Sequence, residues 1–539
     1  MRRTIVTPGI SLSAAFACAA IGQTTLITGP SSSADPYVRP TPGSPVRTVV
    51  SILTVGDSVG GYTLVGIPDG LGAFDNEDGT FTLLVNHELT STAGGIQHPF
   101  QPAGFIGGAF VSKWTIDAST LQVAAGADAM LSVVATSNGT GGSLYTFNRF
   151  CSADLAAPSA YYNPATGKGT QERIFLHGEE AGAPGRILAT VTGTGESYQL
   201  QAFDPLQGSW ENALGRPYES DTTAVIANSD GGGNRVFLYL GTKQSTGNPV
   251  ERAGLQNGVG YGIQVQVDGV DVAAENRTFC FNASGAPLYT ATFTLGPAGT
   301  DSGTAFLRPE DGAWDPANPT DYYFLTTDRF NSPTQVGRPR LFRLRFSDVN
   351  DLLAGGTIEA LLDGTEGAQM MDNMALVNTI QGGTNIVIQE DPGNNAYNAK
   401  TRLYEVATDT LSVVLQSDPA RFGDEATPPS APFTQDEENS GVIDARAVLG
   451  LGWFIGDTQA HYPLANPLVE GGQLYAFFLP EAVGSCATDL NVDGTTNGAD
   501  LGVLLGGWGQ AGLTDLNRDG TTDGVDVGLL FAAWGDCAI

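Results

Sequence analysis

Short hydrophobic runs that end in polar, mostly acidic triplets recur along this chain in six copies. The runs are 81–85, 174–177, 236–240, 322–325, 386–388 and 453–455, and the triplets after them are Asn86-His87-Glu88, Gly178-Glu179-Glu180, Gly241-Thr242-Lys243, Thr326-Thr327-Asp328, Gln389-Glu390-Asp391 and Gly456-Asp457-Thr458. Successive runs lie roughly 60 to 90 residues apart, which is too long for one hairpin and fits a four-stranded sheet with its loops. The pattern predicts an all-β fold, a β-propeller with six blades.

Acidic or polar segments precede these runs and lead into apolar residues. They are 68–71, 219–224, 308–313, 371–375 and 438–443, with a looser copy at 150–155. If these segments are the innermost strands of the blades, their acidic groups converge on one central channel. Crowded carboxylates repel one another, so such a ring is stable only when cations neutralise it. Calcium prefers oxygen ligands and is the expected cation.

Acidic side chains dominate the charge of the chain. It has 57 Asp and Glu against 25 Lys and Arg, a formal net charge of −32. A protein that binds nucleic acid needs a basic surface for the phosphates, so this balance argues against such a partner. The 71 glycines and the many Thr, Val, Tyr and Phe fit strands joined by turns.

The N-terminus has the features of an export signal. Arg2 and Arg3 precede a weakly apolar run, which ends in the small residues 17–20 where a peptidase can cut. We expect a signal peptide at 1–22, a linker at 23–45, the propeller at 46–482 and a C-terminal module at 486–537. The mature chain is then secreted or periplasmic, free or attached to the cell surface, and it has no transmembrane segment.

Four cysteines remain after removal of the signal peptide, and an exported chain can form disulfides. Cys486 and Cys537 bracket the C-terminal module and are predicted to pair. Cys151 has two alternatives. It pairs with Cys280, or it is a metal ligand.

The C-terminal module contains two copies of a calcium-loop pattern, 489–500 and 515–526. Such loops need oxygen ligands at positions 1, 3, 5, 9 and 12, a backbone carbonyl at position 7, and a glycine at position 6 for the sharp turn. The residues at these ligand positions are Asp489, Asn491, Asp493, Thr495, Asn497 and Asp500 in the first loop, and Asp515, Asn517, Asp519, Thr521, Asp523 and Asp526 in the second. Each loop runs into a short apolar segment. The pattern predicts two calcium ions bound to a small α-helical module.

This duplicated module resembles a type I dockerin. The resemblance implies a cohesin-like or cell-surface partner for the module. A calcium-stapled C-terminal cap without any partner is the alternative.

The main domain resembles the PhoX family of secreted alkaline phosphatases, in which a six-bladed propeller holds calcium and iron. The resemblance rests on Asn86-His87-Glu88, Gly178-Glu179-Glu180, Arg308-Pro309-Glu310 and Asp372-Asn373. It implies metal-assisted hydrolysis of a phosphomonoester. Glu310 would then bind metal, and Arg308, whose planar fork suits a pair of phosphoryl oxygens, would bind the substrate.

The resemblance also implies a set of metal ligands. We expect them to be Cys151, Glu179, Glu180, Glu219, Asp221, Glu310, Asp372, Glu390 and Glu438. The chain departs from the family at Gly178, where family members carry a cysteine, and around Cys151, where the usual pair of glycines is missing. Calcium is therefore the expected metal, with ferric iron as an additional candidate that depends on Cys151.

Two other functions fit the same pattern. One is a noncatalytic propeller that uses channel calcium for rigidity and attaches to carbohydrate or to a surface. The other is a calcium-dependent lactonase or phosphotriesterase, because propellers support these reactions as well and a fold does not fix a function. Acidic groups from most blades, with an arginine next to one of them, favour several metal ions and a polyanionic substrate.

Overall fold

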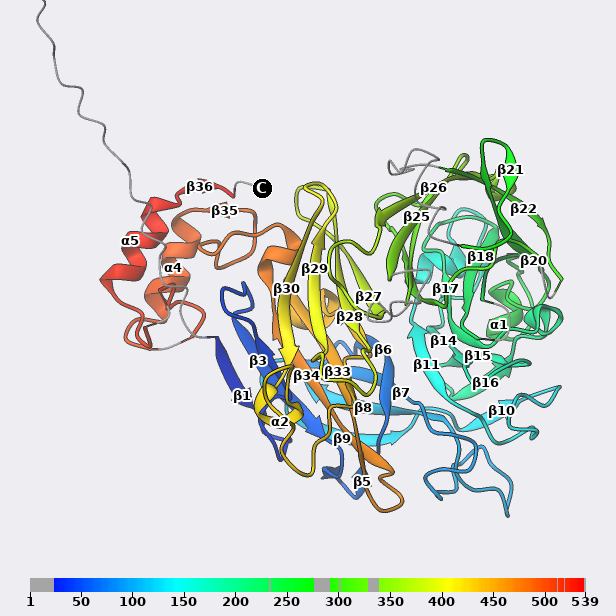
Figure 1. The fold of residues 1–539 in the computed structure, drawn as a ribbon, viewed down its shortest axis with the longest axis horizontal. Coiled ribbons are helices and arrows are strands. Elements are labelled where there is room, and N and C mark those ends of the chain that lie inside the picture. Colours follow the sequence, from blue (N-terminus) through cyan, green and yellow to red (C-terminus); the bar gives the residue numbers. More distant parts are fainter. Residues whose placement is uncertain are drawn as a thin grey trace, which may run out of the picture.

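Antiparallel sheets make up most of the molecule, shown as a ribbon in Figure 1. The computed structural model describes residues 24–231, 234–275, 291–299, 302–327, 339–510, 512–517 and 519–537. The predicted signal peptide at 1–22, Asp328 and Cys280 lie outside these ranges. In the part of the chain that is described, no helix is long and apolar enough to cross a membrane.

A ring of short inner strands surrounds a central channel. These strands are β6 (Pro68–Asp75), β11 (Phe150–Asp154), β17 (Trp210–Gly215), β23 (Pro309–Trp314), β27 (Met371–Asn378) and β32 (Val442–Asp444). Each contacts the next one along the chain, and β32 contacts β6, so the ring closes. Side chains and backbone from all of these strands line a cavity of about 300 Å³ between them. This is the propeller-like arrangement that the acidic segments predicted.

Further antiparallel strands extend outward from each inner strand. They are β7 (Thr80–His87), β8 (Phe110–Asp117) and β9 (Val123–Asp128) after β6; β14 (Ile174–Glu179), β15 (Ile187–Val191) and β16 (Glu196–Gln199) after β11; and β18 (Thr222–Ser229), β19 (Arg235–Thr242) and β20 (Val259–Val267) after β17. The others are β24 (Asp321–Thr326), β25 (Arg340–Phe346) and β26 (Gly356–Leu362) after β23; β28 (Thr384–Glu390), β29 (Lys400–Glu405) and β30 (Thr410–Ser417) after β27; and β33 (Trp453–Pro463), β34 (Glu470–Phe478) and β3 (Thr48–Thr54) after β32.

The sheets differ from the six separate four-stranded blades that the sequence predicted. Among the described residues, the sheets of four or more strands have six, five, ten, five and four strands. The ten-stranded sheet arises because β22 (Ala291–Pro297) pairs with both β20 and β26 and so joins two outer edges. Pairing of exposed edges satisfies backbone groups that would otherwise stay open.

Short strands extend several of these sheets. β10 (Ser132–Val134) pairs with β16, β21 (Val270–Asp271) with β20, and β31 (Glu437–Glu438) with β33. β1 (Thr25–Thr28) pairs with β3, and β2 (Val38–Pro40) pairs with β30. The segment 23–45, expected to be a linker, is therefore partly built into the sheets.

Strand β3 closes the ring of sheets. It comes from the N-terminal part of the chain but pairs with β34 near the end of the ring, from Thr48 opposite Phe478 to Thr54 opposite Gln473. All seven of its residues are buried. Its side chains pack in two directions, since Val49 belongs to a core cluster with Phe477 and Ile52 to another with Leu83. Closure of the ring thus depends on both backbone pairing and apolar burial.

Helices are short and lie mostly outside the sheets. They are α1 (Pro249–Arg252), α2 (Pro419–Phe422) and α3 (Arg446–Leu449), with 3-10 turns η1 (Pro158–Ala160), η2 (Gln201–Leu206), η3 (Leu352–Ala354) and η4 (Pro480–Val483). Two small hairpins are formed by β4 (Ser58–Val59) with β5 (Tyr62–Thr63) and by β12 (Tyr162–Asn163) with β13 (Lys168–Gly169).

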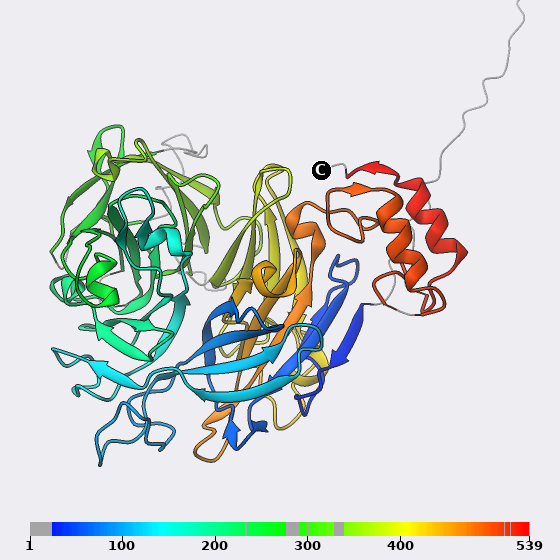
Figure 2. The ribbon, with the colours of Figure 1, turned by 180° about the vertical axis from the view of Figure 1, so that it is seen from behind.

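The C-terminal module lies at one end of the molecule beside β1 and β3, as both ribbon views show (Figures 1 and 2). It contains β35 (Thr495–Thr496), α4 (Gly498–Gly506), α5 (Gly524–Ala532) and β36 (Gly535–Asp536). The predicted disulfide between Cys486 and Cys537 is confirmed. Val492 of the first loop belongs to the same core cluster as Phe478 and Val483, so the module packs directly on the sheets.

Replacement of Ile52 by alanine tests the closure of the ring. Ile52 is fully buried in β3, so Ile52→Ala should lower the free energy of unfolding by about 2–5 kcal/mol through lost burial and the cavity left behind. Urea denaturation followed by tryptophan fluorescence measures the change. The control is Ile27→Ala in β1, where the side chain is 41% exposed and a change under about 0.5 kcal/mol is expected. Equal effects of the two variants would contradict a closing role for β3.

Candidate metal centre

The second residue of five of the six inner strands is a potential metal ligand. These residues are Asp69 in β6, Cys151 in β11, Glu211 in β17, Glu310 in β23 and Asp372 in β27. In the sixth position, Glu438 ends β31, the two-residue strand just before β32. We call this set the inner ring. Asp372 is half-buried and the others are buried.

A β-bulge follows the first residue of five of the six inner strands and directs the second one. The pairing register shifts between Pro68 and Leu71 in β6, and the same shift occurs at 150–153, 210–212, 309–312 and 371–374. In the sixth position the chain leaves the sheet between β31 and β32. A bulge breaks the strict alternation of faces in a strand and re-aims a side chain. The inner ring is therefore a consequence of a backbone irregularity repeated around the channel.

A second set of polar residues follows the second strands. The first residue of an inner strand pairs with His87, Glu179, Ser229, Thr326, Glu390 or Ala460. The residues directly after these partners are Glu88, Glu180, Asp230, Thr327, Asp391 and His461. We call this set the outer ring. Its positions match the third residue of several of the predicted triplets.

Three groups drawn from the two rings have the geometry for a metal ion. The groups are Asp69 with Glu88 and Cys151, Glu211 with Glu310 and Asp372, and Asp372 with Asp391 and Glu438. In each group the ligand atoms lie within 4.8 Å of one another. Asp372 belongs to two groups, so two of the sites can share a bridging carboxylate. This is the convergence of acidic groups on the channel that the sequence predicted.

Burial and mutual repulsion raise the pKa values of most of these carboxyl groups, although the pKa of Glu88 is lowered. The pKa of Glu211 and that of Glu438 are raised to about 7, and that of Glu180 to about 8, first by burial and then in part by neighbouring acids. The pKa values of Asp69, Glu310 and Asp372 are raised well above their usual range for the same reasons. Oδ1 of Asp69 is buried without a hydrogen bond among the described residues. A cation would satisfy such an oxygen and neutralise the repulsion.

Cys151 is buried and forms no disulfide with any cysteine of the described residues. Its Sγ lies 3.8 Å from Oε2 of Glu180. Burial and the carboxylates of Glu88 and Glu211 raise the pKa of Cys151 well above that of an ordinary thiol. The thiol therefore stays protonated in the absence of a cation, and a bound cation would favour the thiolate. Its alternative partner Cys280 lies outside the described residues.

Amide side chains tie the second strands to the inner ring. Nδ2 of Asn86 donates to the carbonyl oxygen of Cys151 over 2.6 Å, and Nδ2 of Asn228 donates to the carbonyl oxygen of Glu310. Oγ of Ser152, the residue after Cys151, donates to Oε1 of Glu211 over 2.7 Å. These hydrogen bonds hold ligand-bearing backbone in place from neighbouring strands.

Arg308 lies beside the second group of ligands. Nε of Arg308 donates to Asp230 over 3.0 Å, and Nη2 lies 3.2 Å from Oε1 of Glu310. Its side chain is 47% exposed, while both carboxylates are buried. Arg308 thus reaches from the metal-ligand groups toward solvent, which is the position that a substrate-binding arginine requires.

Several predicted ligands are engaged elsewhere. Both oxygens of Glu179 accept hydrogen bonds from Arg186, at 2.6 Å and 2.9 Å, and both side chains are fully buried. Glu390 accepts hydrogen bonds from Arg402 at 2.7 Å and from Tyr397 at 2.9 Å. The ladder places these two glutamates one residue before the outer ring, on the opposite face of their strands. Glu180 and Asp391 occupy the ring positions instead.

The sequence prediction assigned the third copy of the repeat to the wrong strand of its sheet. The run at 236–240 is β19, the third strand of its sheet, and Glu219 and Asp221 lie near the turn between β17 and β18. Asp221 forms an ion pair of 2.6 Å with Lys168 near the surface. The residues in ring positions are Glu211 and Asp230, which the prediction missed. The run at 222–229 leads into Asp230, and its end, Asn228-Ser229-Asp230, resembles Asn86-His87-Glu88. The sequence therefore contained the pattern that identifies Asp230 as a ring residue.

The inner and outer rings contain other residues that were not predicted as ligands. Asp69 was not selected from its acidic segment, Glu88 and Asp391 were not selected from their triplets, and His461 lies three residues beyond the sixth triplet. Nδ1 of His461 lies 2.6 Å from Glu470, and its Nε2 lies 3.5 Å from Glu438. The exact register of the second strands decides these positions, and hydrophobic runs define it only within a few residues.

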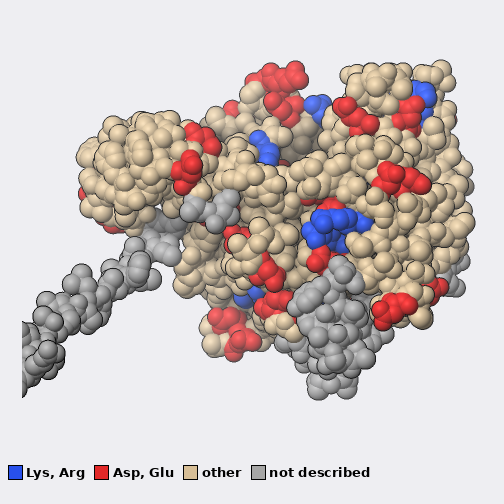
Figure 3. All heavy atoms as spheres, turned by 90° about the horizontal axis from the view of Figure 1, so that it is seen from above, with Lys and Arg blue, Asp and Glu red and all other residues tan. Residues whose placement is uncertain are grey.

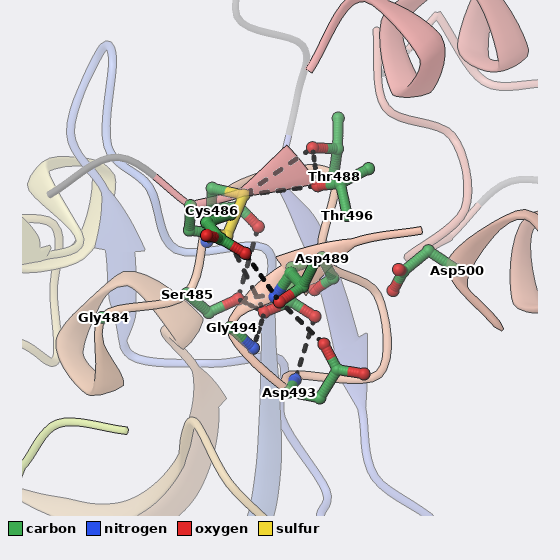
Figure 4. The surroundings of a disulfide bond; sticks show 12 residues. Gly484, Ser485, Cys486, Thr488, Asp489, Asp493, Gly494, Thr496 and Asp500 are labelled. Carbon is green, nitrogen blue, oxygen red and sulfur yellow. Dashed lines mark hydrogen bonds between the residues drawn. A yellow bond between two sulfur atoms is a disulfide. The ribbon is translucent and has the colours of Figure 1, made fainter. Parts of the chain in front are cut away.

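The two C-terminal loops have the same internal hydrogen bonds. Asp489 accepts from the backbone N–H of Asp493 at 3.0 Å and of Gly494 at 2.7 Å, as Figure 4 shows. Asp515 accepts from Asp519 at 3.1 Å and from Gly520 at 2.7 Å.

The ends of the two loops are alike as well. The position-9 residues Asn497 and Asp523 cap α4 and α5, each in a capping box with the position-12 residue Asp500 or Asp526. Repetition of these contacts in both copies is what two equivalent calcium loops require. The calcium ions themselves stay a prediction.

Comparison with known proteins assigns this chain to no family. No family model matches the chain, and no curated protein matches it. Among solved structures, PhoX from Pseudomonas fluorescens in complex with vanadate, a transition state analogue, is 11% identical with a TM-score of 0.48, over 85% of this chain and 98% of that one. A Hadza microbial sialidase is 9% identical with a TM-score of 0.35, over 80% and 68%. An α-L-arabinanase from Penicillium chrysogenum is 9% identical with a TM-score of 0.33, over 77% and 94%. Likenesses this low assign neither a family nor a reaction.

Glu211 offers a direct test of the inner ring. Glu211→Gln removes a charged ligand from the group with Glu310 and Asp372, so the variant should bind at least one calcium ion fewer than the unmodified chain. Calcium content after dialysis, measured by atomic emission, gives the result. The control is Asp221→Asn, which removes the carboxylate of a partly exposed ion pair and should leave the calcium content unchanged. Loss of calcium in Asp221→Asn but not in Glu211→Gln would show that the ring is wrongly identified.

The free energy of unfolding of the calcium-free protein should fall as the pH rises from about 4.5 to about 8. The raised pKa values of Glu180, Glu211 and Glu438, about 8, 7 and 7, mean that the folded state holds protons that the unfolded chain releases above about pH 4.5. Their contribution to stability is present below that pH and is lost as the pH rises to about 8. Calcium binds the ionised groups and should reverse the loss.

Differential scanning calorimetry at pH 5 and pH 8.5, with chelator and with calcium, measures this dependence. We expect calcium to raise the Tm more at pH 8.5 than at pH 5, and we expect the difference to narrow in Glu211→Gln. An equal calcium effect at the two pH values would contradict the assignment of these carboxyl groups to metal sites.

Proposed function

We propose that this chain is a metal-dependent phosphatase that hydrolyses phosphomonoesters at the mouth of the central channel. The observation that carries the proposal is the pair of features around Glu310: three groups of potential metal ligands, and a half-exposed arginine held against one of them. Clustered cations and an arginine suit a polyanionic substrate. A single catalytic calcium, as in a lactonase-type site, would need far fewer carboxylates.

The residues of the chain have distinct roles in this proposal. Carboxylates of the inner and outer rings hold the cations, with calcium as the expected metal and ferric iron as a candidate at Cys151. Bound cations would supply positive charge to the phosphoryl oxygens and a nucleophile at alkaline pH. Asp230 fixes the guanidinium of Arg308 through Nε and Nη2. Arg308 then donates to a phosphoryl oxygen and stabilises the charge that develops there.

The same proposal covers the organisation of the chain. It has an export signal at 1–22, a propeller-like domain built around a ring of six inner strands, and a dockerin-like module at 486–537 that binds two calcium ions. Exposed apolar side chains near and on the module helices support a docking role for it. They are Val503, Leu505, Trp508, Val525, Phe531 and Trp534.

Hydrolysis of p-nitrophenyl phosphate by the purified full chain tests the proposal. Chelation should abolish turnover at alkaline pH, and calcium, alone or with iron, should restore it. Arg308→Ala should lower kcat/KM by about 100-fold or more, because an oriented donor to the transition state is lost. The control is Arg345→Ala, another half-exposed arginine paired with a buried carboxylate, Asp321, on an outer strand. That variant should keep full activity.

Two outcomes would contradict the phosphatase. Full activity in Arg308→Ala would remove the arginine from the reaction. No turnover with any metal, in a protein that calcium still stabilises, would favour a noncatalytic propeller that uses calcium for rigidity.

A further inference from the structure

Arg149, directly before β11, has the same backbone conformation as Arg308, directly before β23. Each arginine directly precedes the first residue of an inner strand, in Arg149-Phe150-Cys151 and Arg308-Pro309-Glu310. Each has a left-handed backbone, with φ of 55° at Arg149 and 58° at Arg308. This region is unfavourable for residues other than glycine, and such strain collects at binding and catalytic sites. Met370, directly before β27, has a φ of 45° at the same position, so this backbone belongs to the repeat, and the two arginines occupy equivalent places in it.

Each arginine contacts two carboxylates, and the first of these lies at an equivalent position for both. Nε of Arg149 donates to Oε1 of Glu88 over 2.6 Å, and Nε of Arg308 donates to Asp230 over 3.0 Å. Glu88 and Asp230 occupy the same outer-ring position on the preceding second strand. Nη2 of Arg149 lies 2.9 Å from Glu180, as Nη2 of Arg308 lies 3.2 Å from Glu310. Each guanidinium is thus fixed along one edge by two carboxylates.

The other edge of each guanidinium is open. Nη1 makes no hydrogen bond or ion pair in either arginine within the described residues. The Arg149 side chain is 42% exposed and the Arg308 side chain 47%, although their partner carboxylates are buried. Arg186, which pairs with the buried Glu179, is by contrast fully buried with its partner. Arg149 and Arg308 instead hold donors in solvent in a fixed orientation.

Each arginine lies beside a different group of metal ligands. Arg149 contacts Glu88 of the group with Asp69 and Cys151, and Arg308 contacts Glu310 of the group with Glu211 and Asp372. Strand β17 contacts both β11 and β23 and lies between them in the ring. A phosphoryl group held over Glu211 would therefore have one arginine on either side.

We propose that Arg149 is a second phosphate-binding residue, which with Arg308 selects the dianionic phosphoryl group of a monoester. This inference rests on the proposed phosphatase function. A monoester has three terminal oxygens and two negative charges, enough for two arginines and the cations, whereas a diester has two terminal oxygens and one charge. The second arginine therefore makes the site specific for monoesters over diesters.

Binding of inorganic phosphate to the calcium-loaded full chain tests the proposal without turnover. Isothermal titration calorimetry on the unmodified chain, Arg149→Lys, Arg149→Gln and Arg345→Gln gives the affinities. Loss of a charge-assisted donor pair should weaken binding by about 10- to 100-fold in Arg149→Gln and by a smaller factor in Arg149→Lys, which keeps the charge but not the fork. Arg345→Gln should bind like the unmodified chain.

Calcium content and Tm separate a binding role from a structural one. Arg149→Lys should keep both, because a cation still faces Glu88 and Glu180. If this variant loses calcium in proportion to its phosphate affinity, Arg149 serves the metal ligands and the proposal is wrong. If phosphate binding is unchanged in both Arg149 variants while Arg308→Ala loses it, the proposal fails and the phosphatase function stands. If the unmodified chain neither binds nor hydrolyses phosphate compounds, both fail.

Substrate preference provides a readout that a structural role would not move. With p-nitrophenyl phosphate and bis(p-nitrophenyl) phosphate as substrates, Arg149→Lys should lower kcat/KM for the monoester about 10-fold and leave the diester within about 3-fold. An equal loss for the two substrates would overturn the assignment of Arg149 to monoester selection.

Discussion

Repulsion between buried carboxylates is the constraint on which the centre of this molecule depends. The inner ring brings together five acids and one thiol, and the outer ring adds four acids and one histidine beside them. In water such groups would ionise independently, but burial raises the pKa values of most of them and makes protonation the way to relieve the charge. Cations relieve it in a different way, and they turn a destabilising cluster into a site. The structure is a scaffold that forces acids together, and in the proposed function metal ions neutralise them.

The scaffold achieves this with one backbone device repeated around the channel. A bulge after the first residue of an inner strand aims the second residue at the ligand groups, and the adjacent strand contributes the residue just beyond its ladder. Amides such as Asn86 and Asn228 then fix the inner backbone from the neighbouring strand. The ligands come from strands rather than from flexible loops. Sites on rigid elements hold their geometry more precisely than sites on loops, which suits a cluster with shared ligands.

Much of the fold could be predicted from the sequence, and the reason is the spacing of hydrophobic runs. Five of the six predicted inner segments correspond to inner strands, and Glu310, Asp372, Glu438 and Cys151 lie in ligand groups. The incorrect site predictions arise because hydrophobic periodicity does not determine which strands pair or in what register. Runs at 222–229 and 236–240 are both hydrophobic and both end in polar residues, so periodicity alone could not show which of them lies next to the inner strand, and Glu211 and Asp230 were lost with that choice. Glu179 and Glu180 are equivalent in sequence, and only the ladder register assigns one to Arg186 and the other to the ring.

Closure of the ring by β3 has a consequence for the order in which the molecule can assemble. The last sheet needs Thr48–Thr54 from the beginning of the ring and β33 and β34 from its end, so every strand in between must exist before the channel is circular. Contacts this distant in sequence are slow to form, because loop-closure entropy is lost before the contacts contribute. During that interval Asp69 and Glu438, which flank the closing seam on β6 and β31, are still apart. The complete set of ligands thus forms late in folding, and a cation that binds it stabilises the closed ring against reopening.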